Sequence, residues 1–241
     1  MKGMSFLPAQ SLLPDINPAE VLRYLGCRCS CDDLLEQIRT LSAEILCRIR
    51  PRTAFRKFQL NMTPHSVEIV GTTTVLPGND IRNWLANCHQ AIFFAVTLGV
   101  EMDSFLRQRQ LSNMGDALVL DACLSAAIDA VCSNLRASIQ KEYAAQNCFL
   151  TDSFSPGYGD LPISLQQDFL VLLDAQRRIG LTCTSESILI PQKSVTGLWG
   201  IATSPINPAP SRCNTCSMNG KCPYQLQTSG SCNPLPADAS S

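Results

Sequence analysis

The chain has 241 residues, enough to bury a sizeable core as one domain with a small appendage. Its formal net charge is -1 and its basic residues are scattered, which disfavours a nucleic-acid or anionic-membrane surface. The longest apolar run, 91–100, is about half of the roughly 20 residues that a membrane-spanning helix needs. The first residues lack the apolar core of a signal peptide, so we expect a cytoplasmic protein.

The first part of the chain predicts two helices. Asn17, Pro18 and Gly26 have the order of an N-cap, a first-turn proline and a C-terminal glycine. A second helix is expected from about 32 to 50, because apolar residues recur every three or four positions and Pro51 stops it.

A change to β-like periodicity follows, with short strands expected within 55–60, 67–70 and 73–76. A helix near 79–89 and a buried strand at 91–98 come next.

The longest helix is expected from about 116 to 145 on the basis of its apolar stripe. Asp121, Ser125 and Asp129 are four residues apart and therefore share one face of it. These carboxylates suit a cationic ligand group or a partner arginine, but a solvent-facing polar strip has the same pattern.

A turn-rich octapeptide, 153–160, follows this helix and reads Ser-Phe-Ser-Pro-Gly-Tyr-Gly-Asp. Its proline and glycines predict turns whose N–H and C=O groups point at a ligand, with Tyr158 as a ring on an open backbone. Such dipeptides are also ordinary turns, so the motif alone is weak.

The remaining elements are predicted from short motifs. A capping box of Ser164 and Gln167 predicts a helix to about 178, and strands are expected at 181–190 and 193–201. Glycines in the last strand mark positions where a backbone or a ligand comes close. We find no arrangement typical of a catalytic triad. The only histidines, His65 and His89, are interpreted as surface or structural residues.

Several motifs in this order resemble one known family. They are Ser155-Pro-Gly-Tyr-Gly-Asp160-Leu-Pro-Ile-Ser-Leu-Gln166, Arg178-Ile-Gly180, Thr184-Ser-Glu-Ser187, Pro191-Gln-Lys-Ser-Val195 and Gly197-Leu-Trp-Gly-Ile201. Together they resemble the activation (reactivation) domain of cobalamin-dependent methionine synthase, in particular its stand-alone versions, over about 15–203.

The resemblance implies an α+β, helmet-like domain with an antiparallel sheet flanked by helices. It also implies S-adenosylmethionine binding, with Ser155, Gly157, Tyr158 and Asp160 on the ligand-contacting loop. The implied role is reductive remethylation of cobalamin on a partner protein such as methionine synthase, with flavodoxin or ferredoxin as the electron donor.

The sequence departs from the family at Ser153, where the family's loop has an arginine. A charge-assisted hydrogen bond to a carboxylate is worth about 1.5–3 kcal/mol, so its loss should weaken binding roughly ten- to a hundredfold unless another cation replaces it. Asp152 makes the local charge less favourable still. Arg177, Arg178 and Lys193 are the candidate replacements.

Thirteen cysteines without a secretion signal indicate reduced thiols, some of them metal ligands. After a proline-rich linker at 204–212, the tail 213–241 carries Cys213, Cys216, Cys222 and, as a fourth ligand, Cys232. Zinc and an iron–sulfur cluster both accept four thiolates, and the Cys-Pro pair at 222–223 favours the cluster slightly. Cys27, Cys29 and Cys31 either add ligands or are independent thiols.

Two functions remain open at this point. The first is a stand-alone corrinoid-activation protein whose first domain spans 1–203. The second is a non-enzymatic accessory or assembly protein that has the same fold but no S-adenosylmethionine, with a structural zinc tail.

Overall fold

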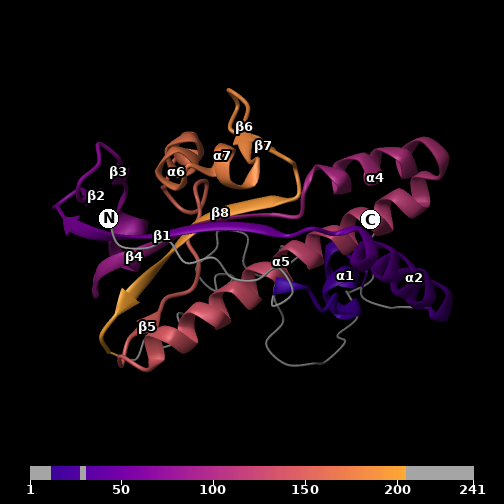
Figure 1. Ribbon diagram of the computed structural model, residues 1–241, viewed down its shortest axis with the longest axis horizontal. Coiled ribbons are helices and arrows are strands. Elements are labelled where there is room, and N and C mark those ends of the chain that lie inside the picture. Colours follow the sequence, from indigo (N-terminus) through magenta and orange to yellow (C-terminus); the bar gives the residue numbers. More distant parts are fainter. Residues whose placement is uncertain (1–11, 28–30, 205–241) are drawn as a thin grey trace, which may run out of the picture.

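The computed structural model describes residues 12–27 and 31–204, which form an α+β fold around an antiparallel sheet (Figure 1). The sheet has six strands in the order β3-β2-β1-β4-β8-β5. Their bounds are β1 Arg52–Met62, β2 Ser66–Ile69, β3 Val75–Pro77, β4 Cys88–Thr97, β5 Phe149–Leu150 and β8 Ser194–Ala202. The predicted fold class is therefore confirmed.

The central strands β4 and β8 are buried on both faces of the sheet, which explains their continuous apolar sequences. In β4, the side chains of Ile92, Phe94 and Val96 enter one core, and those of Ala91, Phe93 and Ala95 enter the other. Phe94 stacks on Trp199 of β8, with ring centroids 3.9 Å apart. The sheet thus separates two hydrophobic cores.

Four helices cover the first face of the sheet and the end beyond it (Figure 1). They are α1 Pro18–Tyr24, α2 Asp32–Arg48, α4 Val100–Ser112 and α5 Met114–Ala144. Helix α5 is long and apolar enough to cross a membrane by length and composition, but 56% of its most apolar window is buried within the fold. Most of its apolar residues pack in this core, of which α5 is the central helix, although Met114 and Leu118 are exposed.

The opposite face is covered by short elements. They are α3 Asn79–Trp84, α6 Gln166–Leu173, α7 Ala175–Ile179 and a hairpin of β6 Thr182–Cys183 and β7 Leu189–Ile190. Phe169, Leu170 and Leu173 of α6 insert into the second core, where Phe169 lies 4.8 Å from the ring of Phe93.

Most predicted elements are present, with differences at their ends. Asn17 caps α1 as expected, since its Oδ1 accepts a hydrogen bond from the N–H of Ala19 at 2.9 Å. The predicted helix at 79–89 ends at Trp84, because β4 already begins at Cys88. Helix α4 had no predicted counterpart, although Met102, Phe105 and Leu106 have helical spacing and are buried.

The region after the octapeptide differs more from the prediction. The expected capping box does not form: a 3-10 turn at Ile163–Leu165 precedes α6, and no side chain caps either element. The predicted helix to 178 is interrupted at Asp174, whose φ of 51° is left-handed. The predicted strand 181–190 is instead a hairpin, because a turn closed by Thr184 separates its two short strands.

Candidate functional site

The octapeptide and the residues before it lie along the free side of β8 and extend the short strand β5. Phe154 and Leu198 exchange two backbone hydrogen bonds of 3.0 and 2.8 Å. Thr151 accepts a bond from the N–H of Gly200 through Oγ1 at 2.8 Å. The start of the loop is therefore fixed to the sheet.

Gly197 and Gly200 allow this close approach. A Cβ at Gly197 would lie 2.8 Å from Phe94 and 2.9 Å from Oγ of Ser155. A Cβ at Gly200 would lie 2.6 Å from Sγ of Cys88. The glycines of the last strand thus admit protein groups, which is one of the two alternatives that the sequence left open.

The turns of the octapeptide satisfy part of their own backbone. The N–H of Gly157 donates to Leu161, that of Tyr158 to Ser155, and that of Leu161 to Tyr158, at 2.9 to 3.0 Å. These amides therefore do not point at a ligand, contrary to the expectation. Gly157 and Gly159 have φ values of 90° and 51°, which glycine adopts at little cost.

The predicted site residues occupy different environments within the loop. Ser155 is buried at 9% exposure, whereas Gly157, Tyr158 and Asp160 are exposed. Tyr158 is 42% exposed, and its ring meets that of Phe154 edge-on at 6.1 Å. The structure therefore presents Tyr158 outward and Ser155 inward.

Asp160 joins the loop to α3. Its carboxylate accepts the N–H of Asn79 at 2.6 Å and that of Asp80 at 3.1 Å. A carboxylate in this position satisfies otherwise unpaired donors of the first helical turn. This contact gives Asp160 a structural role, which the sequence motif did not reveal.

The residues that precede Ser153 bind a cation that sequence reasoning missed. Arg136 of α5 donates from Nε to the carbonyl of Thr151 at 3.1 Å and from Nη2 to that of Leu150 at 2.9 Å. Its Nη2 also lies 3.5 Å from Oδ1 of Asp152. A guanidinium is thus held at the residues that lead into Ser153.

The three cations that the sequence proposed as replacements are held elsewhere. Nζ of Lys193 lies 2.8 Å from Oδ1 of Asp121 and 2.9 Å from Oγ of Ser125. Arg177 and Arg178 pair with Asp174 at 2.5 and 3.7 Å. Helix α7 packs in the same core as Phe154 of the loop, but both of its arginines are paired with Asp174.

The polar line on α5 forms as predicted and binds partners inside the chain. Asp121 and Ser125 hold Lys193, which fits the expectation of a cation on this line. Asp129 accepts a hydrogen bond from the hydroxyl of Tyr24. Burial, followed by this bond, raises the pKa of Tyr24 to about 12. The line therefore connects α5 to β8 and to α1.

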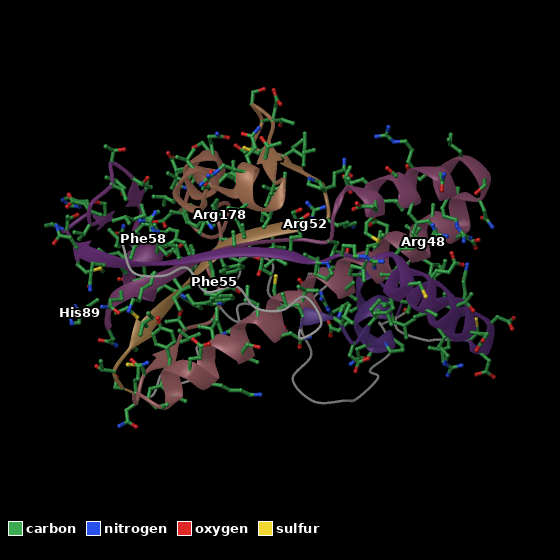
Figure 2. All side chains as sticks on the ribbon, viewed as in Figure 1. Arg48, Arg52, Phe55, Phe58, His89 and Arg178 are labelled. Carbon is green, nitrogen blue, oxygen red and sulfur yellow. The ribbon has the colours of Figure 1, made fainter. Side chains whose placement is uncertain are left out.

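The predicted metal ligands Cys213, Cys216, Cys222 and Cys232 lie outside the described residues, as does Cys29. Cys27 and Cys31 are exposed. Over residues 12–27 and 31–204, no group of three or more His, Cys, Asp or Glu side chains is placed to hold a metal ion. His65 and His89 are both exposed, and Figure 2 shows His89 at the periphery of the sheet.

No protein-family model matches this sequence, and no curated protein matches it in a sequence search. A search of solved structures does find a similar fold, in a crystal structure of the MetH reactivation domain bound to AdoHcy. The TM-score is 0.62 at 14% identity, over 85% of this chain and 79% of that chain. This chain therefore has the fold of the MetH reactivation domain.

Proposed function

We propose that this protein supports reductive remethylation of cobalamin on a partner protein, as a stand-alone methionine synthase activation domain. The observation that carries the proposal is the fold shared with a reactivation domain that was solved with AdoHcy. AdoHcy is S-adenosylhomocysteine, the product left when S-adenosylmethionine gives up its methyl group. We infer that S-adenosylmethionine is the methyl donor and that the protein works in the cytoplasm.

The partner is a cobalamin-binding protein, in the first place methionine synthase. Bound S-adenosylmethionine would supply the methyl group from its sulfonium, and an electron donor such as flavodoxin or ferredoxin would supply one electron to cob(II)alamin. The present chain's part is to hold the donor and present it to the partner.

The loop residues divide this task. We assign contact with the ligand to Tyr158, whose ring is the exposed apolar surface of the loop, and to the backbone carbonyl of Gly157, since the N–H of Gly157 is bonded to Leu161. Ser155 and Asp160 shape the loop, because Ser155 packs beneath Gly197 and Asp160 is bonded to α3. The ligand's carboxylate is assigned to Arg136, the guanidinium held at the residues before Ser153.

Titration calorimetry tests this assignment. S-adenosylmethionine should bind the wild type weakly, because the guanidinium of Arg136 is shared with two backbone carbonyls and Asp152. Ser153→Arg should tighten binding roughly ten- to a hundredfold by adding a second charge-assisted bond. Arg136→Gln should weaken S-adenosylmethionine but leave methylthioadenosine unchanged, since that compound has no carboxylate. A tight wild-type complex that Ser153→Arg does not improve would contradict the proposal.

The second candidate function is a non-enzymatic accessory or assembly protein. It is favoured because two carboxylates that could face a ligand already have partners within the chain. Asp121 is paired with Lys193, and Asp160 accepts hydrogen bonds from the start of α3. An accessory protein would bind S-adenosylmethionine neither as the wild type nor as Ser153→Arg. That outcome, together with one zinc per chain, would select this alternative.

We further propose that the tail, 213–241, binds an iron–sulfur cluster or zinc through Cys213, Cys216, Cys222 and Cys232, joined to the domain 1–203 by the linker 204–212. The sequence alone supports this proposal. Anaerobically purified protein should be brown if the tail carries a cluster. Colourless protein with stoichiometric zinc would overturn the cluster and leave a structural staple.

A further inference from the structure

Strand β1 has a long free edge although it lies in the interior of the strand order. It pairs with β4 from Arg52 to Gln59, but with β2 only from Leu60 to Met62. On the side away from β4, no strand of the described chain lies beside Arg52–Phe58. Strand β1 is therefore an edge strand from Arg52 to Phe58 and is paired on both sides only near its C-terminal end.

One hydrogen bond shows which residues of β1 direct their backbone N–H and C=O groups away from β4. The N–H of Val70 donates to the carbonyl of Gln59 at 3.0 Å, so Gln59 faces away from β4. Because antiparallel pairing alternates, Lys57, Phe55 and Thr53 turn their N–H and C=O groups in the same direction. Thr53 is buried, however, whereas Phe55 is half-buried and Lys57 is exposed, so the accessible part of this row is at Phe55 and Lys57. No backbone hydrogen bond joins these groups to another described residue. Such a row is a template for an added strand.

The side chains along this edge are positively charged. Arg52, Arg56 and Lys57 are exposed, and none forms an ion pair within residues 12–27 and 31–204. Arg109, in contrast, pairs with both Glu44 and Asp116. These three cations along the edge thus have no Asp or Glu partner among the described residues.

These charges lie on both faces of the strand. The guanidinium of Arg56 lies 4.9 Å from the ring of Phe58, which is buried in the core on the α6 side. The ammonium of Lys57 lies 5.9 Å from the ring of Tyr143 on α5. Figure 2 shows Arg52 and Phe58 on the α6–α7 side of β1 and Phe55 on the α5 side.

Charged edges often prevent a sheet from pairing with copies of itself. Here the same charges define what can pair, because a second β1 edge would be repelled and an acidic strand attracted. We propose that the edge of β1 from Arg52 to Phe58 binds an extended acidic segment of a partner protein as an added strand. Acidic residues of that segment lie opposite Arg52 and Arg56 on one face and opposite Lys57 on the other.

A designed peptide tests this surface on the full chain. The probe is a fluorescently labelled, blocked peptide of sequence Thr-Glu-Glu-Val-Thr-Val-Glu-Thr, which places glutamates opposite all three cations in an antiparallel pairing. Two further versions carry N-methyl groups on alternate amides. In one version the methylated amides are those that would face β1, and in the other they are those that would face away from it. Only methylation of the amides that face β1 should abolish binding, because only those amides donate hydrogen bonds to the edge.

Anisotropy should show saturable binding that Arg52→Gln with Arg56→Gln weakens about tenfold or more. Arg39→Gln with Arg107→Gln is the matched control, since it removes equal charge from helices and should leave affinity unchanged. In hydrogen exchange, the amides of Phe55 and Lys57 should become protected only with the peptide.

Four results would overturn the proposal. They are no binding, equal binding of the two methylated versions, equal loss in the control variant, or protection of the Phe55 and Lys57 amides in the free protein. Equal binding of the methylated versions would reduce the effect to electrostatic attraction. Protection in the free protein would mean that the chain itself already covers the edge.

Discussion

Replacing Asp160 by alanine should loosen the octapeptide and destabilise the fold. The carboxylate accepts two backbone N–H groups at the start of α3, at 2.6 and 3.1 Å. Loss of a side-chain cap of this kind costs about 0.5–2 kcal/mol, and because Asp160 is exposed, we expect about 1 kcal/mol. Asp160→Asn keeps one acceptor oxygen and should lose about half as much.

Urea unfolding measures this change. With a slope of about 1–3 kcal/mol per molar urea, a loss of 1 kcal/mol lowers the midpoint by roughly 0.3–1 M at unchanged slope. Glu142→Ala is the control, because this exposed acid lies near the C-terminal end of α5, where the helix dipole does not favour it. If Asp160→Ala and Glu142→Ala behave alike, the assigned role of Asp160 is wrong.

Three further predictions concern other parts of the fold. Gly159→Ala should destabilise the loop by about 1–3 kcal/mol in the same urea assay, because a φ of 51° is left-handed and strained for alanine. Unchanged stability would refute this role of the glycine. The pKa of Tyr24 is raised from 10.0 to about 12, so the stability it contributes is present below pH 10 and is lost as the pH rises toward 12. Tyr24→Phe should therefore make the free energy of unfolding depend less on pH over that range. The same pH dependence in the variant and the wild type would contradict this assignment. Burial raises the pKa of Cys88 to about 11, so Cys88 should be alkylated more slowly than the exposed Cys47, as followed by mass spectrometry. Equal alkylation rates would contradict this prediction and show that the fold opens readily around Cys88.

The sequence predicted those elements whose pattern is local. The uninterrupted apolar run at 91–98 indicated a strand buried on both faces, and it became β4 between the two cores. The caps and stripes of α1, α2 and α5 are likewise local signals, and these helices end within a few residues of their predicted bounds. Helix α4 was missed although its three buried residues have helical spacing.

The candidate site was harder to predict because its contacts are distant in sequence. Asp160 bonds to α3 some eighty positions earlier, and Lys193 reaches Asp121 from the position just before the last strand. Neither pairing leaves a periodic signal. Arg136 was missed for the same reason, because its bonds to Leu150 and Thr151 depend on how α5 crosses β5. Its only signal was a lone arginine in a mostly apolar helix.

We propose above that this protein reactivates a cobalamin protein. The most direct measurement uses a methionine synthase whose own reactivation domain has been removed and whose cobalamin is in the cob(II) state. With an electron donor and S-adenosylmethionine, adding this protein should convert the visible spectrum to that of methylcobalamin, and Arg136→Gln should slow the conversion. A cob(II) spectrum that stays unchanged, or that changes equally without this protein, would contradict the proposed function.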